Sequence, residues 1–537
     1  HDYLSGLKPI PAAVTAAGQD QLYRTAVMAI AAHEDKTYRG AFVASLSTPW
    51  GQAADADSGG VAGYHAVWAR DLYQMATALV ADGDTAAAGR ALDYLFDVQQ
   101  KADGSFPQNT WLDGSPYWGG LQMDEVSFPL ILADTLGRTD AATWAKVKKS
   151  ADFVVAHGPW TPQERWEENA GYSPATIAAE IAGLVSAADI AAKNGDTASA
   201  STYLATADSW RSQVDAWTYT TSGHLPGGQY YERIDDNGDP NDGATLTIGN
   251  GGGSWDERDV VDGGFLDLVR LGIKAPTDPH VTNSLATLDA TIKRTIDGHD
   301  YWYRYNHDGY GETASGAPYT GAGIGRLWPV LSGERGEYAL ARGQSAAPYL
   351  AGMAASATEG NLIPEQIWDV ASAHGFTQGY ATDSANPLSW ALGQYVRLAQ
   401  STVGGANLDT PQVVCLRYGT CPGGGSTQTF TVTVPSGTDA TGRTVYLAGT
   451  LSRLTPPRTD WAADGVALTR VDATHWRATV DVVPGTALEY KYTLGDWNTV
   501  EKSASCGELG NRSVTTTAGG STADTVANWR NVAPCGP

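Results

Sequence analysis

Two short stretches place glutamate beside tryptophan in segments rich in turn-forming residues. In QERWEENAGYSP, Trp166 is followed directly by Glu167 and Glu168, and in GNLIPEQIWDV, Glu365 follows proline and precedes Trp368. Two carboxyl groups can hydrolyse a glycosidic bond, because one protonates the leaving oxygen while the other activates water or attacks the sugar. The first must hold a proton near the working pH, which an apolar neighbour such as Trp166 favours. An adjacent Glu-Glu pair without such neighbours is an ordinary surface feature. The catalytic interpretation therefore depends on the neighbouring tryptophans.

Arg70 and Asp71 stand at the front of an apolar-periodic segment, GYHAVWARDLYQMATAL. An adjacent pair of this kind is most often a structural salt bridge. At a helix entrance it can instead bind sugar hydroxyls, with arginine donating and aspartate accepting hydrogen bonds. Three further residues stand beside Gly or Pro turns that favour a loop position, namely Trp118, Arg326 and Trp390.

The elements that must hold these residues are helical. From about residue 19 to 401, Ala-rich segments with helical spacing alternate with long loops rich in Gly, Asp, Trp and Tyr. Ser173 and Pro174 predict a helix start directly after the first glutamate stretch. We expect an all-α domain over 1–402 whose loops carry the site, and no parallel α/β sheet. The predicted helices are 22–32, 67–80, 86–98, 125–136, 144–156, 174–192, 198–216, 260–271, 281–295, 336–354 and 388–399.

The composition changes after this domain. Residues 403–426 are rich in Gly, Pro and Cys and end in PGGGS, which predicts a linker. From residue 427 to 537, alternating stretches such as TFTVTV, HWRATVDV and LEYKYTL lie between turn residues. This pattern predicts a small all-β domain, an antiparallel β-sandwich.

Charge and composition exclude several classes of function. The 537 residues include 59 acidic and 35 basic side chains, so the chain should bind neither nucleic acid nor anionic membranes. No long apolar run predicts a membrane span. The excess of 18 Trp and 25 Tyr over 8 Phe suits ligands that are half apolar and half polar, such as sugars. Four cysteines in two local pairs predict two disulfides and a secreted, extracellular protein.

The helical part resembles the bacterial glucoamylase and glucodextranase family of glycoside hydrolases. The segments WARD, YWGGLQMDE, ERWEENAGYSPATIAAEIAG, GRLWPVLSGERGEY, PEQIWD and PLSWALGQY stand in the family's order and span most of residues 1 to about 400. The resemblance implies an (α/α)6-barrel catalytic domain. It also implies an inverting enzyme that releases β-D-glucose from the non-reducing ends of starch and maltooligosaccharides.

Carried over by motif, the resemblance makes Glu167 the general acid and Glu365 the general base. Glu168 would contact the sugar on the leaving-group side, and Tyr64 would orient the base. The remaining implied substrate-binding residues are Trp68, Arg70, Asp71, Tyr117, Trp118, Trp166, Arg326 and Trp390.

The C-terminal segment is similar to starch-binding domains of the glucoamylase type. The run DWAADGVALTRVDATHWRATVDVVPGTALEYKY carries this similarity. It implies a starch-binding surface that includes Trp461 and Lys491. A second binding tryptophan is expected where Val500 stands, and Trp497 lies nearby. Starch binding by this domain is the expectation, and a sandwich that keeps only the fold is the alternative.

The loop RIDDNGDPNDG offers a weak calcium candidate. Asp235, Asn237 and Asp239 alternate as in calcium loops, but no glutamate closes the series at its twelfth position. A solvated turn is favoured over a bound ion, and no cofactor is expected to be required.

Three functions compete. The leading one is a monomeric glucoamylase that cleaves α-1,4 links of starch and, more slowly, α-1,6 links. A glucodextranase would use the same acids mainly on α-1,6 links, and Tyr117, Tyr319 and Glu168 are the residues expected to decide between them. A non-catalytic carbohydrate-binding protein is disfavoured because both candidate acids and the Arg-Asp pair are present.

Overall fold

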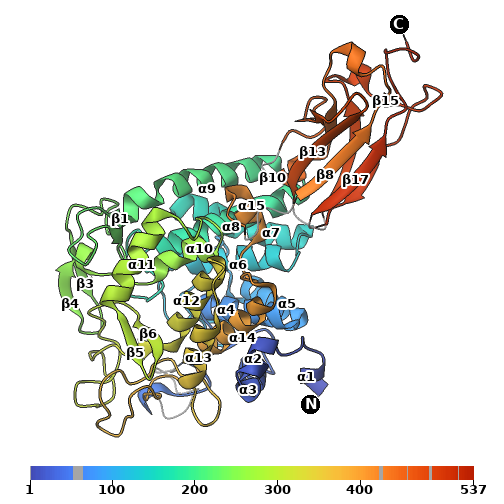
Figure 1. Cartoon of the computed structure of the whole chain (residues 1–537). Coiled ribbons are helices and arrows are strands. Elements are labelled where there is room, and N and C mark those ends of the chain that lie inside the picture. Colours follow the sequence, from blue (N-terminus) through green and yellow to red (C-terminus); the bar gives the residue numbers. More distant parts are fainter. Residues whose placement is uncertain are drawn as a thin grey trace. The chain divides into compact units, whose positions relative to one another are not determined.

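The chain folds into two compact units, residues His1–Pro411 and Gln412–Pro537 (Figure 1). The computed structural model describes residues 2–51, 64–421, 427–455, 458–482, 486–517 and 519–536. The stretch predicted as a linker contains the end of α14 and the short helix α15 (Gln412–Tyr418).

Six helices form a closed inner ring in the first unit. Each packs against the next, and the last packs against the first. In ring order they are α4 (Ala69–Asp82), α6 (Met123–Thr135), α8 (Pro174–Lys193), α10 (Asp267–Arg270, preceded by the 3-10 turn η4 at Gly264–Leu266), α12 (Pro329–Ala341) and α14 (Ser389–Gly404).

A second layer of helices lies outside this ring. Its members are α3 (Asp20–His33), α5 (Thr85–Tyr94), α7 (Ala141–His157), α9 (Thr197–Thr218), α11 (Pro279–Thr291) and α13 (Ala347–Ala355). The short helices α1 (Asp2–Ser5) and α2 (Ala12–Ala16) precede them. Alternating inner and outer helices form an (α/α)6 barrel, which confirms the predicted fold class.

The sequence explains which helices lie inside. α8 has apolar or small residues on every face and is buried along nearly its whole length, whereas α9 buries only one stripe. A helix that is apolar all round must be covered on all sides, and a helix with one apolar stripe needs only one neighbouring layer. Although α8 is long and apolar enough to cross a membrane, 89% of that stretch is buried within the protein, as expected for a core helix.

Three predicted helices differ from the structure. Of the helix predicted over 260–271, only residues 264–270 are helical, as η4 followed by α10. The segment 336–354 is divided into α12 and α13, because Gly343 adopts a left-handed φ of +70° just beyond the end of α12. The helix predicted over 281–295 ends at Thr291, and the chain continues as strand β5. The loops also carry short strands that the helical prediction omitted: β1 (Tyr219–Thr220), β2 (Tyr230–Tyr231), β3 (Thr245–Ile248), β4 (Gly253–Asp256), β5 (Lys293–Ile296), β6 (His299–Tyr303) and β7 (Leu327–Trp328).

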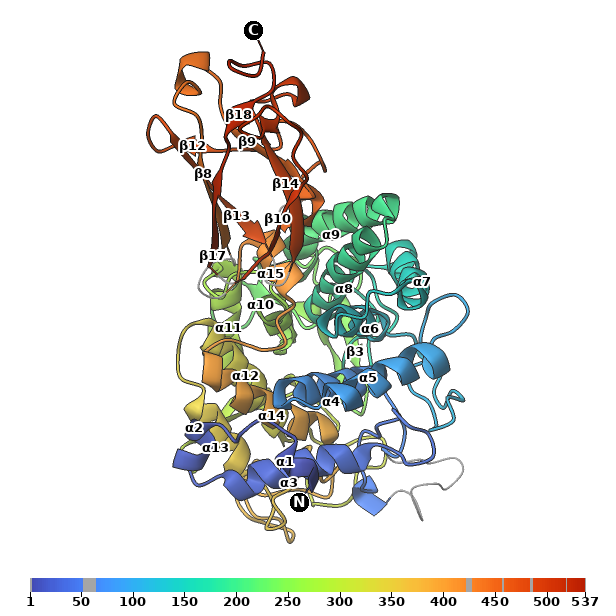
Figure 2. The same cartoon turned by 90° about the vertical axis from the view of Figure 1, so that its right-hand side faces the viewer.

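The second unit is a β-sandwich, and Figure 2 shows its two sheets facing each other. One sheet has the order β10-β13-β8-β17, with β12 also paired to β13, and the other has the order β11-β9-β14-β16. Their inward side chains, including Val432, Leu447 and Tyr490, share one hydrophobic core. The strands are β8 (Thr427–Thr433), β9 (Tyr446–Gly449), β10 (Leu454–Thr455), β11 (Val466–Ala467), β12 (Thr469–Arg470), β13 (His475–Val482), β14 (Ala487–Thr493), β15 (Glu501–Lys502), β16 (Arg512–Thr515), β17 (Gly520–Thr525) and β18 (Asn528–Trp529).

Two details of this unit bear on the sequence predictions. The disulfides Cys415–Cys421 and Cys506–Cys535 confirm the two local pairs. The sandwich is not wholly antiparallel, because β17 pairs with β8 in parallel. β17 follows β16 of the opposite sheet, so the chain crosses between the sheets before it forms this pair.

Candidate active site

A pocket of about 580 Å³ lies where the inner helices begin. Its floor includes Arg70, Asp71 and Trp390 from the first turns of α4 and α14. Its walls come from the segments that precede the inner helices. These segments meet at one rim of the barrel, because each of them connects an outer helix to the start of an inner helix. The remaining lining residues are Ala44, Pro49, Tyr64, Trp68, Gln108, Tyr117, Trp118, Arg165, Trp166, Glu167, Glu168, Gly249, Asn250, Arg304, Tyr310, Tyr319, Trp328, Glu365 and Leu388.

Glu167 reaches this pocket from a tight turn before α8. Its backbone has a left-handed φ of +68°, and its N–H donates to the Glu164 carbonyl at 2.8 Å. The carboxylate accepts a 2.7 Å hydrogen bond from Gln108 Nε2, and Arg70 Nη1 lies 3.8 Å from its other oxygen. Burial raises the pKa of Glu167, and the nearby Arg70 only partly opposes this effect. The protonated form of Glu167 is therefore more favoured than that of an ordinary glutamate.

Trp166 fixes the wall behind this turn. Its indole N–H donates to Asp262 at 2.9 Å, and its ring stacks on Trp390 at a centroid distance of 6.0 Å. It also packs edge-on against Trp328 and lies under the Arg165 guanidinium. These contacts give one side of the pocket a rigid aromatic surface that suits the apolar face of a sugar ring.

Glu168 has different surroundings from its neighbour. Asn250 Nδ2 donates to Oε1 at 2.6 Å, and Arg304 Nη2 donates to the same oxygen at 3.0 Å. Arg233 Nη2 lies 3.4 Å from Oε2, and Tyr305 also donates to that oxygen. Burial opposes ionisation, but the two arginines outweigh it and lower the pKa of Glu168. The surroundings of these adjacent glutamates therefore shift their pKa values in opposite directions.

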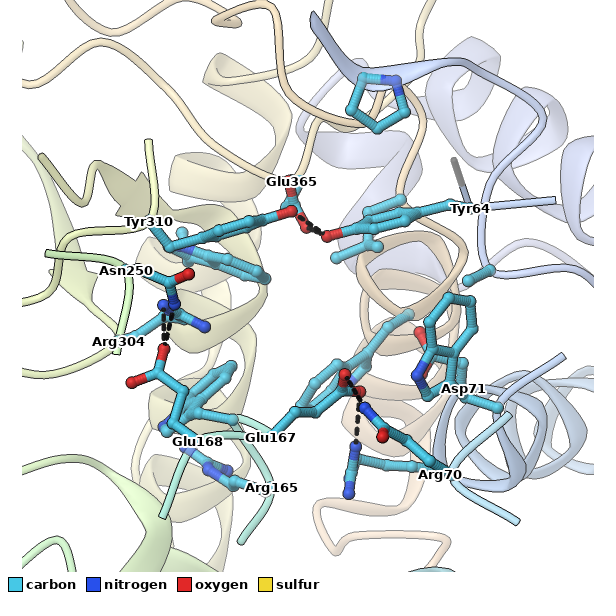
Figure 3. A pocket seen from close by; sticks show the side chains of 18 of the residues that line it. Tyr64, Arg70, Asp71, Arg165, Glu167, Glu168, Asn250, Arg304, Tyr310 and Glu365 are labelled. Carbon is cyan, nitrogen blue, oxygen red and sulfur yellow. Dashed lines mark hydrogen bonds and ion pairs between the residues drawn. The ribbon is translucent and has the colours of Figure 1, made fainter. Parts of the chain in front are cut away.

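Glu365 faces Glu167 from the opposite side of the cavity, as Figure 3 shows. The Tyr64 hydroxyl donates to Glu365 Oε1 at 2.6 Å and is itself bonded to the Tyr310 hydroxyl. Burial raises the pKa of Glu365 to about 7, while the hydrogen bond from Tyr64 favours the ionised form. Glu365 therefore changes between its acid and carboxylate forms near neutral pH, and the carboxylate can accept a proton.

Arg70 and Asp71 are not partners of each other. The Arg70 guanidinium donates to Asp124 at 2.7 and 3.0 Å and also to Gln122. Asp71 lines the cavity, where burial raises its pKa to about 7. Arg70 is thus a fixed positive charge beside Glu167, and Asp71 keeps free acceptor capacity for a hydroxyl group.

The structure brings most of the predicted pocket residues together. Tyr117 and Trp118 stack at 5.1 Å, Trp118 packs against Trp68 at 5.8 Å, and Tyr319 lines the same cavity. Trp118 is 41% exposed, so this aromatic group forms part of the rim.

Arg326 does not line the pocket. Its guanidinium pairs with Asp369 at 2.7 Å, donates to the backbone carbonyls of residues 312 and 313, and stacks on Trp368 at 4.0 Å. These partners hold its charge away from the cavity. The arginine that lines the pocket beside Glu168 is Arg304, which the sequence analysis missed because it follows β6 without a Gly or Pro signal.

Asn250 and Tyr310 were also missed. They come from irregular loops far from Glu168 and Glu365 in sequence, and only the fold brings them to these carboxylates. The Gly-rich run from 249 to 253, which contains Asn250, marks a turn, but nothing in it predicts a contact with Glu168.

The remaining predicted residues lie outside the pocket. Trp461 and Trp497 are neighbours in the second unit, with ring centroids 6.3 Å apart and Trp497 39% exposed. Lys491 is half-buried and donates to the Leu509 carbonyl. In the calcium candidate, Asp235 is buried whereas Asn237 and Asp239 are exposed, so the three do not converge.

The barrel and its pocket together define a class of protein. The buried carboxyl group of Glu365 and the partly exposed one of Glu167 face each other across an aromatic-walled cavity, where they can act as the base and the acid of glycosidic bond cleavage. Fold and site therefore place the chain among the glycoside hydrolases. The chain belongs to glycosyl hydrolases family 15, because the model of this family matches residues 18–400.

Known proteins agree with this assignment. A glucoamylase from Clostridium sp. (strain G0005) is 50% identical over 399 residues, which cover 74% of this chain and 55% of the relative. A bacterial glucoamylase solved in complex with acarbose is 47% identical, with a TM-score of 0.72 over 78% of this chain and 60% of that chain. The present chain therefore spans little more than half the length of these relatives. A glucoamylase from Hypocrea jecorina, at 15% identity and a TM-score of 0.50 over 96% of this chain and 99% of that chain, supports the fold alone.

Proposed function

We propose that the protein is an exo-acting, inverting glycoside hydrolase that releases β-D-glucose from the non-reducing ends of starch and α-1,4-linked dextrins. It would cleave α-1,6 links more slowly. The observation that carries this proposal is the pair Glu167 and Glu365, which enter one pocket from opposite sides. The similarity to two glucoamylases supports the choice of α-glucan substrate.

In the proposed reaction, Glu167 gives its proton to the glycosidic oxygen while the bond from that oxygen to C1 breaks. Glu365 takes a proton from a water molecule, whose oxygen bonds to C1 from the opposite face. The products are β-D-glucose and a dextrin shortened by one unit, so all atoms and protons are balanced. The raised pKa of Glu167 and the Tyr64 hydrogen bond to Glu365 suit these two roles.

Two features of the pocket support cleavage at a chain end. Arg70, Asp71 and Trp390, from the first turns of α4 and α14, line the pocket and are buried, which suits a site that takes a chain end. The Tyr117 and Trp118 stack at that rim offers a platform for the next sugar, and Glu168 with its arginines lies on the same side as the proton donor. We assign Asp71 and Arg70 to the hydroxyls of the terminal glucose.

Product analysis tests this proposal. Maltoheptaose and isomaltoheptaose are digested in parallel and followed by NMR during the first minutes. β-Glucose as the sole early product, released faster from maltoheptaose, supports the proposal. Faster release from isomaltoheptaose assigns the enzyme to α-1,6 links instead, and α-glucose or longer products refute the inverting pocket.

We further propose that the second unit binds starch. Trp461 and Trp497 present neighbouring rings on its surface, an arrangement suited to stacking on glucose units. Trp461→Ala in the whole chain should reduce adsorption to granular starch without changing maltoheptaose hydrolysis. Val471→Ala, at an exposed apolar residue of the same unit, is the control. Unchanged adsorption of the Trp461 variant refutes the assignment.

We also propose that the protein is secreted and acts as a monomer. Two disulfides and no free cysteine among the described residues suit an oxidising compartment. Light scattering of the active protein measures its mass, and a dimer would contradict the proposal.

A further inference from the structure

Three buried carboxylates outside the pocket have oxygens without partners. Glu232, Asp235 and Glu257 are each at most 1% exposed, and one oxygen from each lies within 4.8 Å of the others. Neither oxygen of Glu232 has a hydrogen-bond partner, nor do Oδ2 of Asp235 and Oε1 of Glu257. Buried polar atoms are normally hydrogen-bonded, so three such groups in one place require an explanation.

No described basic side chain forms an ion pair with these three residues. Two basic residues are adjacent to these carboxylates in sequence, but Arg233 pairs with Glu164 at 2.7 Å and Arg258 is bonded to Asp256 at 2.6 and 2.9 Å. Burial raises the pKa of Glu232 to about 10, and repulsion from Glu257 and Asp235 adds to the effect. Burial likewise raises the pKa of Glu257 to about 8 and that of Asp235 to about 6. Holding all three ionised therefore needs a positive charge between them.

We propose that Glu232, Asp235 and Glu257 form a calcium site. Oxygen ligands of calcium lie about 2.3–2.6 Å from the ion, so two ligands on opposite sides are about 4.6–5.2 Å apart. Three oxygens that all lie within 4.8 Å of one another are therefore close enough to share one ion. Carboxylate oxygens are hard ligands that suit calcium, and their burial disfavours magnesium, which usually keeps several waters.

The backbone holds the three ligands in place. Glu232 N donates to the Thr218 carbonyl at 3.0 Å, and Glu257 N donates to the Ala244 carbonyl at 3.1 Å. Asp235 Oδ1 accepts the N–H groups of residues 237 and 238, which leaves Oδ2 free for an ion. The site thus joins the end of β2, the following loop and the 3-10 turn η3 (Glu257–Asp259).

This ligand set differs from the loop pattern in the sequence. Only Asp235 is shared, because Asp239 is exposed and its carboxylate caps the Asn241 N–H. The two glutamates stand outside the alternating series, at residues 232 and 257, and the fold of the chain brings them to Asp235.

A cation here would also brace the active site. Arg233 lies between two of the ligands in sequence, and its guanidinium reaches Glu164 at 2.7 Å and Glu168 at 3.4 Å. Glu164 in turn accepts the N–H of Trp166 at 2.6 Å. An ion that fixes residues 232–235 therefore also fixes the segment that carries the proposed proton donor.

Calcium binding to the whole chain tests the site directly. Protein stripped with EDTA is titrated with calcium chloride by calorimetry, and its melting temperature is compared in EDTA and in 1 mM calcium chloride. We expect one high-affinity site per chain and a rise of about 3 °C or more, since a ligand that binds only the folded state stabilises it. Absence of binding, or binding of magnesium chloride in preference to calcium chloride, overturns the assignment.

Matched variants locate the ion. Glu232→Gln and, separately, Glu257→Gln should each lose the calcium response, while Asp239→Asn from the same loop should keep it. The alternative is that the three carboxyl groups are protonated and hydrogen-bonded to one another without an ion. In that case glutamine preserves the shape of the cluster, and calcium does not raise the melting temperature of the wild type. A response that survives in both glutamate variants, or disappears in the Asp239 variant, refutes this ligand set. None of these readouts requires hydrolytic activity, so they are independent of the proposed function.

Discussion

Removing the Tyr64 hydroxyl should shift the pH dependence of hydrolysis upward. The hydroxyl donates a 2.6 Å hydrogen bond to Glu365, whose pKa burial raises to about 7. The bond favours the carboxylate, so Tyr64→Phe raises the pKa of Glu365 further. As a general base, Glu365 acts only when ionised, and activity is therefore lost as the pH falls through its pKa. The acidic limb of kcat/KM must move to higher pH in the variant.

The size of this shift follows from the hydrogen bond. A hydrogen bond to a charged group contributes about 1.5–3 kcal/mol, and about 1.36 kcal/mol corresponds to one pH unit. The acidic limb should therefore move upward by about one to two pH units. At a pH below both limbs, kcat/KM should fall about 10- to 100-fold, and at high pH it should approach the wild-type value.

The assay is the initial rate of glucose release from maltoheptaose across the pH range. Tyr310→Phe is the matched control, because its hydroxyl bonds that of Tyr64 and no bond between it and Glu365 is observed. We expect this control to leave the acidic limb nearly unchanged. A uniform loss of activity in Tyr64→Phe, with no change in the limb, would refute the electrostatic reasoning and leave Tyr64 only a role in shape.

Three further predictions concern both units. Glu167→Gln and Glu365→Gln should each lower kcat about 10²- to 10⁴-fold, while the circular dichroism spectrum stays unchanged. Near-normal turnover in either variant would contradict the role of that residue. Glu359→Gln, which changes an exposed glutamate, is the control. Glu168→Gln should lower the free energy of unfolding, measured in urea, by about 1.5–3 kcal/mol, the contribution of a hydrogen bond to a charged group. The loss should not be larger, because each of the two arginines that bind Glu168 keeps its pairing with another carboxylate. Replacing Cys506 and Cys535 together by Ala should lower the free energy of unfolding of the second unit by about 3–4 kcal/mol, because the disulfide restricts the entropy of a loop of this length in the unfolded chain. Maltoheptaose hydrolysis should not change. A loss of hydrolysis that accompanies the loss of stability would contradict the independence of the two units.

Local patterns were sufficient to predict a helical domain followed by a sandwich and to single out Glu167 and Glu365, whereas the (α/α)6 barrel followed from the family resemblance. Helical periodicity separated the first unit from the alternating strands of the second, because both periods are properties of neighbouring residues. Glu167 and Glu365 stood out through their aromatic and proline neighbours. The same approach failed for Arg326, whose Gly-flanked position resembles a binding loop although the side chain is bound to Asp369.

What the sequence alone determined is a helical domain followed by a sandwich, with candidate acids in two loops. Tertiary structure decided which charges surround them. Glu167 and Glu168 are adjacent and identical in type, yet the pKa of the first is raised by burial and that of the second is lowered by Arg304 and Arg233. Both arginines are distant in sequence, and a pKa depends on distance in space and on exclusion of water, neither of which the order of residues records.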